Sequence, residues 1–232
     1  MKLQLILIFS FLQCAGFVEA RTVLISKNIN YLEEIEFQGV GSIVVQQGSH
    51  CSVQLEGEEE IVHDTKLKVQ NGILQITRKE SAFKHPSTSL VCTITVANDL
   101  SKIRLMGDAL LQSEKLTLEN LHIDVHNRSS GVISLIGKEL LCQIYDKGSL
   151  NVSGEVKSQE VLVEDSGRYQ AASLACRDCK VKVVGIGEAE VQADEELSAF
   201  VVGQGRIYYL KEPKLISKRV SGNGQILLKE RG

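Results

Sequence analysis

The chain is poor in aromatic residues and has no strong excess of either charge. Of its 232 residues only 5% are aromatic, none is tryptophan and two are proline. So few aromatic side chains leave little for stacking on nucleic-acid bases or on sugars. The formal net charge of −3 gives no basic surface for nucleic acid or an anionic membrane, so we expect neither as a partner.

Several motifs that would indicate chemistry are also missing. The chain has no phosphate-binding P-loop, no Ser-containing nucleophile elbow and no calcium-binding nonapeptide repeat. Nothing in it calls for a cofactor. Beyond residue 20 no stretch approaches the ~20 apolar residues of a membrane span, so none is expected.

The first 20 residues have the pattern of a secretory signal peptide. Lys2 precedes an apolar run over residues 3–12, and Val18 and Ala20 place small residues before the expected cleavage site. The mature chain is therefore expected to be exported and soluble. The sequence does not distinguish between the periplasm, the outer-membrane surface and the extracellular space.

Five cysteines follow the signal peptide, namely Cys51, Cys92, Cys142, Cys176 and Cys179. An odd number in an oxidising compartment leaves at least one thiol unpaired. Cys142 falls at an inward position of the repeat and is expected to be buried. Cys176 and Cys179 are spaced for a local disulfide or for two plain turn thiols, and the spacing does not decide between them.

A short glycine-containing phrase recurs along the chain at intervals of 17 to 22 residues from Ala109 onward. A period near twenty is typical of a solenoid. Apolar residues alternate with polar ones on both sides of each phrase, which indicates two strands joined by a sharp bend. The bends, or corners, contain Gly39, Gly41, Gly107, Gly131, Gly148, Gly167, Gly185, Gly187, Gly203, Gly205, Gly222 and Gly224.

A unit this small cannot bury its own apolar side, so the units must stack. The pattern predicts an all-β fold, a parallel β-helix with 17–22 residues per coil. A right-handed coil is favoured because the strict hexapeptide period of left-handed helices is absent. Val163, Val183 and Val201 should form one interior ladder. Replacing Gly205 by valine should be destabilising if its φ angle is positive.

The chain divides into three parts. Residues 1–20 are the signal peptide, residues 21–99 an N-terminal β region that caps the solenoid, and residues 100–232 the β-helix repeats. Asn71-Gly72 predicts an antiparallel hairpin in the N-terminal region. Residues 57–60 are expected to form a charged turn, and residues 79–89 a polar loop.

The last coil carries charges that would protect an open end, with Lys218 at a position where other coils place Val, Ala or Cys. If copies of the chain associate, a lateral contact through outward apolar side chains is expected. The residues assigned to these two roles are Lys218, Lys229, Glu230 and Arg231 for protection, and Tyr208 and Leu227 for lateral association.

Two clusters are candidates for chemistry. His122, Asp124 and His126 alternate along one strand and share its outward face, so they could supply metal ligands, although a solvated outer face is the ordinary interpretation. Asp146 and Asp165 align one coil apart and could act as a glycosidase carboxyl pair. Both aspartates stand where other coils have glycine, so they are turn formers first.

Three stretches share the spacing of a known family. They are Phe37-x-Gly39-Val40-Gly41, the segment Val53-x-Leu55-Glu56-Gly57-Glu58-Glu59, and Leu67-x-Val69-x-Asn71-Gly72-x-Leu74-x-Ile76. With the Gly-x-Gly corners they resemble the bacterial head-GIN-domain family of auto-transporter adhesins, over about residues 31 to 230. The resemblance implies a pectin-lyase-like right-handed β-helix that adheres or binds, without established catalytic residues. The central corners depart from the family's usual Ser-Gly-Ser-Gly, so any binding role of those glycines does not carry over to them.

The sequence thus predicts an exported, non-enzymatic binding or adhesion module that presents the outer faces and corners of a β-solenoid. Its partner is an unidentified ligand such as a glycan or a cell-surface protein. Two alternatives stay open: a carbohydrate-active β-helix enzyme, lyase or glycosidase, built around Asp146 and Asp165, and an envelope scaffold that assembles through its coils. Homo-oligomerisation is compatible with all three.

Overall fold

A computed structural model describes residues 4–6, 22–78 and 90–229 of the chain. The expected cleavage site at Ala20, the polar loop at 79–89 and the charged residues Glu230 and Arg231 lie outside the described residues. Within them the chain is almost entirely β. The strands are β1 (Gln4–Ile6), β2 (Thr22–Ile29), β3 (Glu34–Gln47), β4 (Cys51–Glu58), β5 (Thr65–Gln70), β6 (Ile73–Arg78), β7 (Leu90–Val96), β8 (Lys102–Thr117), β9 (Asn120–Val125), β10 (Ser130–Ile144), β11 (Ser149–Asp165), β12 (Arg168–Gly185), β13 (Glu188–Val191), β14 (Glu196–Gly203), β15 (Arg206–Tyr209), β16 (Leu215–Gly222) and β17 (Gln225–Leu228).

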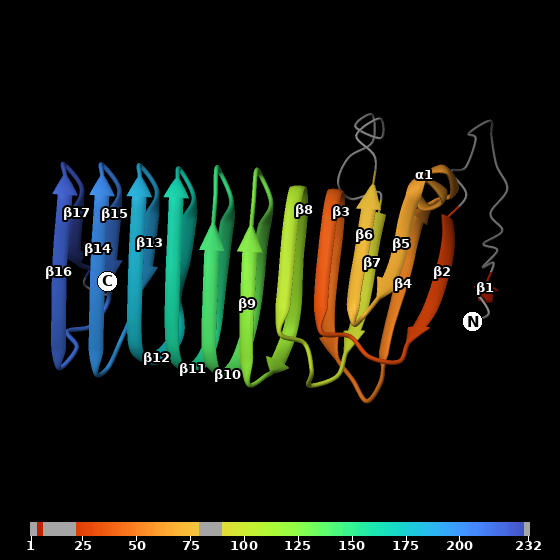
Figure 1. Ribbon diagram of the computed structural model, residues 1–232, viewed down its shortest axis with the longest axis horizontal. Coiled ribbons are helices and arrows are strands. Elements are labelled where there is room, and N and C mark those ends of the chain that lie inside the picture. Colours follow the sequence, from red (N-terminus) through yellow and green to blue (C-terminus); the bar gives the residue numbers. More distant parts are fainter. Residues whose placement is uncertain (1–3, 7–21, 79–89, 230–232) are drawn as a thin grey trace, which may run out of the picture.

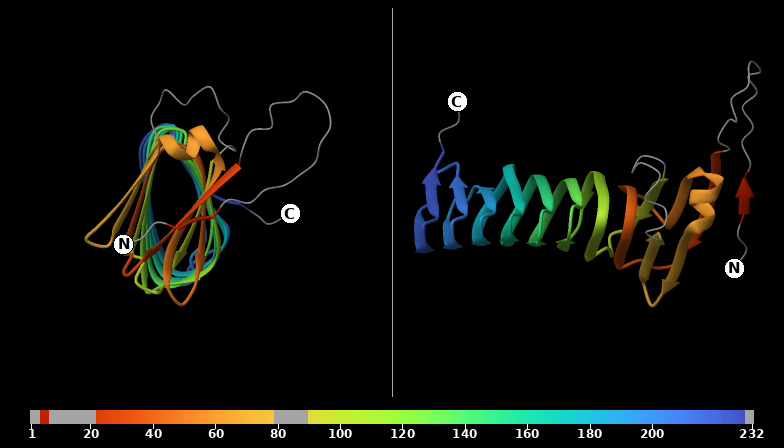
Figure 2. Two further views of the ribbon diagram at one scale, coloured as in Figure 1. Left: turned by 90° about the vertical axis from the view of Figure 1, so that its right-hand side faces the viewer. Right: turned by 90° about the horizontal axis from the view of Figure 1, so that it is seen from above.

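From β8 onward the strands stack in parallel as successive coils of a solenoid, so the predicted fold is confirmed. Figure 1 shows the coils side by side along the long axis, and Figure 2 shows that each coil is a flattened loop. The segments just before the corners form one continuous sheet, whose outward side we call the leading face. It consists of residues 102–107, 120–125, 139–144, 158–165, 178–185, 196–203 and 215–222.

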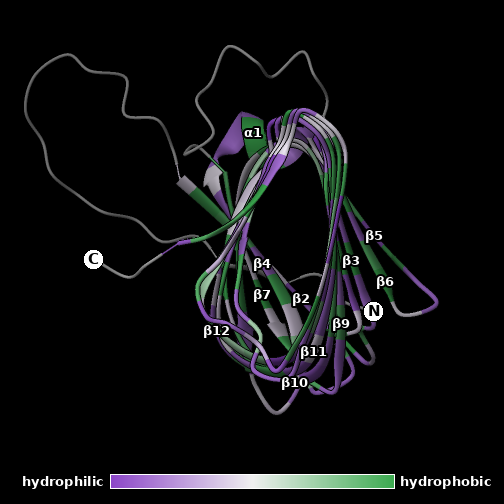
Figure 3. Cartoon of the chain, turned by 90° about the vertical axis from the view of Figure 1, so that its left-hand side faces the viewer, coloured by the Kyte–Doolittle hydropathy of each residue, from purple (hydrophilic) through white to green (hydrophobic). Residues whose placement is uncertain are grey.

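The interior is a set of ladders in which each coil places one apolar side chain on the next. Val163 pairs with Val183, which pairs with Val201, and none of the three exposes any surface. This confirms the predicted ladder. Hydrophobic and hydrophilic residues alternate along these strands (Figure 3), because alternate side chains of a strand point to opposite sides.

Each corner contains one residue in the left-handed region of φ. Glycine occupies this position at Gly185, where φ is 106°, and at Gly203, where it is 108°. Asp146 and Asp165 occupy it in earlier coils, both with φ of 58°. Asp is one of the few side chains that tolerate this region, which explains why it replaces glycine there.

The left-handed residue of the corner that contains Gly205 is Gly203, so the condition on which the effect of Gly205→Val was predicted is not met. Gly205 is needed for a different reason. A Cβ atom on it would lie 2.5 Å from Val183 Cγ1 and 2.7 Å from the carbonyl oxygen of Gly187 in the preceding coil. The second glycine of the phrase therefore permits close stacking of coils, and the first permits the bend.

The N-terminal region joins the solenoid through β3. This strand pairs in parallel with β8 over twelve residues, so Gly39 stacks directly on Gly107. The parallel stacking therefore runs across the boundary expected near residue 100. On its other side β3 pairs in parallel with β6 and β7, and β7, β4 and β2 then continue as antiparallel neighbours.

The hairpin predicted at Asn71-Gly72 is confirmed. β5 and β6 pair in antiparallel fashion, and φ is 52° at Asn71 and 79° at Gly72, as a type I′ turn requires.

The charged turn expected over residues 57–60 is wrong. β4 runs to Glu58, and the helix α1 (Glu59–Asp64) follows because Ile61 and Val62 are buried against the end of the fold. In the described part of the chain no helix has the length and apolarity needed to cross a bilayer.

Candidate functional site

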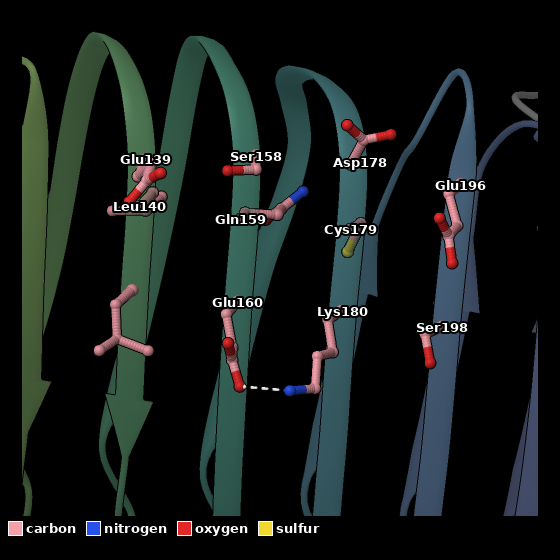
Figure 4. Close-up of a pocket in the computed structure, with 11 residues that line it drawn as sticks. Glu139, Leu140, Ser158, Gln159, Glu160, Asp178, Cys179, Lys180, Glu196 and Ser198 are labelled. Atoms are coloured by element: carbon pink, nitrogen blue, oxygen red, sulfur yellow. Dashed lines mark hydrogen bonds and ion pairs between the residues drawn. The ribbon is translucent and has the colours of Figure 1, made fainter.

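The leading face carries a shallow hollow of about 590 Å³ across four neighbouring coils. Its floor is formed by inward residues of β10, β11 and β12, namely Leu140, Gln159 and Cys179, which are almost completely buried. Its walls are outward side chains of β10, β11, β12 and β14 (Figure 4). We call this hollow the leading-face groove.

Two rows of side chains line the groove, because corresponding residues of stacked coils lie side by side about 4.8 Å apart. Both rows run in the direction of the solenoid axis. The first row is Glu139, Ser158, Asp178 and Glu196, and the second is Leu141, Glu160, Lys180 and Ser198, each in strand register with the next. Ser158 is short and lies between Glu139 and Asp178, which leaves space between these two longer charged side chains.

The groove is acidic and rich in hydrogen-bonding groups. It holds four carboxylates and one ammonium group, and Lys180 Nζ donates to Glu160 Oε1 at 2.9 Å. Both partners of this pair are more than half exposed, so the pair is weak and easily opened by a ligand. Carboxylates accept hydrogen bonds, while serine hydroxyls both donate and accept. Such an arrangement suits a ligand with many hydroxyl groups.

These residues were not predicted from the sequence, although their spacing carries a signal for them. Glu139, Ser158, Asp178 and Glu196 are separated by 18 to 20 residues, the same steps as the corners. Aligning the outward positions of every coil, as was done for the inward ones, would have placed them in one row.

The carboxyl pair Asp146 and Asp165 lies at the corners, away from the groove. Asp146 Oδ2 accepts hydrogen bonds from the backbone N–H of Asn127 at 2.9 Å and from its side-chain Nδ2 at 3.2 Å. Its backbone carbonyl accepts from Ser166 N at 2.9 Å in the following coil. One carboxylate is thus engaged in holding the stack, and the φ angles of both residues are those of turn formers.

The three candidate metal ligands do not converge on a common point. Asp124 Oδ1 lies 2.6 Å from His122 Nε2, but His126 stacks on the ring of Tyr145 with centroids 4.6 Å apart. Asp124 is only 5% exposed, and its Oδ2 lies 3.3 Å from Arg104 Nε. Among the residues that the structure describes, no group of three His, Cys, Asp or Glu side chains could hold a metal ion.

Asp124 instead belongs to a charge network that crosses the leading face. Arg104 bridges it to Glu36 of β3, with NH1 2.8 Å from Glu36 Oε1, and Gln75 Nε2 of β6 donates to Glu36 Oε2 at 2.8 Å. Lys102 Nζ lies 3.4 Å from Asp124 Oδ2. The network ties the N-terminal region to the first coils and already supplies the cations that Asp124 requires.

All five cysteines of the described chain are free and buried. The burial predicted for Cys142 is thus confirmed, and Cys176 and Cys179 are two plain thiols in this structure. Burial raises the pKa of Cys176 to about 11 and that of Cys142 further still. A thiol attacks only as the thiolate, so these side chains are poor nucleophiles at neutral pH.

One protein-family model matches most of the chain. Residues 31–213 match the model of a family described as "Putative auto-transporter adhesin, head GIN domain". The chain belongs to this family. The resemblance in the sequence is therefore confirmed. No match was found among curated proteins.

Solved structures from Bacteroides and Parabacteroides share the fold over nearly the whole length. A "putative adhesin" from Bacteroides fragilis superposes with a TM-score of 0.83 at 23% identity, covering 90% of this chain and 97% of the other. A "putative adhesin" from Parabacteroides distasonis gives 0.70 at 21% identity, covering 91% and 98%. A "putative lipid binding protein" from the same species gives 0.67 at 22% identity with the same coverage. The family supports a binding or adhesion role and suggests a surface or exported protein, and the solved structures support the fold.

Proposed function

We propose that the chain is an exported, non-enzymatic adhesion module that binds a hydroxyl-rich ligand, such as a cell-surface glycan, in the leading-face groove. The observation that carries this proposal is the two in-register rows of side chains, polar except for Leu141, that line one hollow. Their spacing of about 4.8 Å is set by the stacking of coils and not by flexible loops. A rigid array loses little conformational freedom when it binds a long ligand, which favours affinity.

Membership of an adhesin family supports the same function. The carbohydrate-active enzyme has no observation in its favour, because Asp146 serves the corner and its carboxylate is already engaged. Incubating residues 21–232 with a panel of polysaccharides is expected to release no new chain ends. If the unaltered chain does cleave a polysaccharide and Asp146→Asn abolishes this turnover, the adhesion module is contradicted and the carbohydrate-active enzyme is supported.

The binding test uses residues 21–232 on a glycan array and in pull-downs with extracted surface polysaccharides. Replacing Glu160, Asp178 and Glu196 by their amides should reduce retention at least tenfold, because three acceptors lose their charge. The matched control makes the same change at Glu114, Glu119 and Glu155, three exposed carboxylates outside the groove. Equal binding by the two triple variants would contradict the groove as the ligand site.

A further inference from the structure

The last described coil has an open edge. β16 pairs only with β14 and β17 only with β15, and no other described strand lies beside either. Leu215 donates its backbone N–H to the carbonyl oxygen of Glu195 at 2.8 Å. Since backbone groups of successive strand residues point to opposite sides, the N–H and C=O groups of Ile216, Lys218 and Val220 point to the open edge.

The side chains at this edge continue the interior ladders without a coil to cover them. Ile216, Lys218 and Val220 follow Leu197, Ala199 and Val201 in register. The three residues of β14 are buried, whereas Ile216 is 39% and Val220 47% exposed. The edge therefore presents two apolar side chains with a cation between them.

The central cation is held in place but not neutralised. Lys218 Nζ donates to Tyr209 Oη at 2.5 Å and lies 4.2 Å from the centre of the tyrosine ring. Tyr209 Oη in turn donates to Glu212 Oε1 at 3.1 Å. A lysine fixed in this way points into the end of the solenoid interior, at a ladder position where the coils before it have Ala199, Val181 and Val161.

The other lysines of this coil have carboxylate partners. Lys211 Nζ lies 2.7 Å from Asp194, Lys214 Nζ 2.7 Å from Glu195 and Lys229 Nζ 2.8 Å from Glu190. Lys218 and Arg219 have no carboxylate partner among the described residues. The open edge thus keeps a local positive charge in a chain whose net charge is −3.

We propose that this edge binds an extended segment of a partner protein in which a Glu or Asp is flanked, two residues away on each side, by apolar residues. The segment adds to β16 as a further strand, and its backbone pairs with Ile216, Lys218 and Val220. Its apolar side chains cover Ile216 and Val220, and its carboxylate reaches Lys218. The pattern is symmetric, so a parallel or an antiparallel segment presents the same groups.

A second copy of the chain fits the edge less well. Antiparallel pairing of two β16 strands about a central two-fold axis would place Lys218 opposite Lys218, and like charges directly opposite each other are destabilising. The lysine therefore selects against self-association while it admits an acidic strand. The edge site uses the inward side chains and the free backbone edge of β16, whereas the groove uses outward side chains of β10, β11, β12 and β14, so the test of the edge does not depend on the groove.

The test uses residues 21–232 and a fluorescent peptide, Ser-Val-Thr-Glu-Thr-Val-Ser, with a matched peptide that has Lys in place of Glu. Anisotropy is expected to show at least tenfold tighter binding of the Glu peptide, and Lys218→Glu should reverse this preference. Lys157→Glu makes the same charge change at an exposed residue of β11 and should leave the preference unchanged. Equal affinity for the two peptides, or no reversal in Lys218→Glu, would overturn the proposal.

Hydrogen exchange on the unaltered chain gives a second readout, which does not depend on whether a variant folds. The Glu peptide should slow exchange of the Ile216, Lys218 and Val220 amides and leave those of Ser217 and Arg219 unchanged. Val220→Pro removes an edge-facing N–H without removing a bond to β14, and should weaken peptide binding at least tenfold. Protection elsewhere but not at these three amides would contradict the site, and so would a dimer in sedimentation that pairs through β16.

Discussion

The middle coils of the solenoid and its last described coil carry nearly the same sequence pattern but differ in burial. Val183 and Val201 are fully buried, whereas Val220, the next residue of the same ladder, is about half exposed. All eight residues of β16 are exposed. Burial of a side chain in a stacked fold therefore comes from the neighbouring coil and not from the local sequence pattern. The same phrase makes a core in the middle and a docking edge at the end.

The largest expected effect separates these two positions. Val183→Asp should lower the free energy of unfolding by roughly 4 kcal/mol or more, because it buries a carboxylate among apolar neighbours. Val220→Asp should cost less than about 1 kcal/mol, because the new carboxylate reaches water. Urea unfolding followed by far-UV circular dichroism measures both. Similar losses in the two variants would show that the last coil is covered in solution.

A second effect is expected at alkaline pH. Burial raises the pKa of Cys92 to about 12, with an opposing effect of the nearby Arg78 charge, whereas an unfolded thiol ionises near ~8.5. The buried thiol stays protonated while the unfolded one loses its proton. Its contribution is therefore complete below pH ~8.5 and falls by about 1.4 kcal/mol per pH unit above it, up to the folded pKa. Cys92→Ala should flatten the decline between pH 9 and 11, and an unchanged slope would contradict the assignment.

The two glycine positions of a corner should respond differently. Gly205→Ala should cost about 1–3 kcal/mol, because its Cβ would meet Val183 and the backbone of Gly187. Asp165→Gly should change stability by less than about 1 kcal/mol, because relief of the left-handed conformation offsets the greater freedom of the unfolded chain. Thermal unfolding of the two variants compares them. A larger loss in Asp165→Gly would show that its side chain has a further role.

The smallest effect on stability is expected in the groove. Lys180→Ala removes an exposed ion pair with Glu160 and should alter the free energy of unfolding by less than about 0.5 kcal/mol. Its effect should appear in ligand retention on the glycan array. A large loss of stability in Lys180→Ala would contradict this expectation. It would mean that the ion pair helps to hold neighbouring coils together.

Much of the fold could be predicted from the sequence, because the signals for it are local. The alternation around Val163 and Val183 specifies strands, and the recurring corner specifies their stacking. Asn71-Gly72 predicts its hairpin from two residues alone. The helix α1 was missed because six residues are too few to show helical periodicity. The sequence did not show which glycine of the phrase has the positive φ angle, because either Gly203 or Gly205 could have taken the bend.

The repeat, the inward ladders and the positions of the corners follow from the sequence alone. Each of these features is specified by residues that lie close together in the chain. The way in which the N-terminal region joins the stack, and the surfaces that the stacked coils enclose or leave open, became visible only in the folded molecule. There Gly39 lies on Gly107, a hollow opens beside the row from Glu139 to Glu196, and among the described strands only β14 pairs with Ile216, Lys218 and Val220. The physical reason is that groove and edge arise between coils, from backbone pairing across tens of residues.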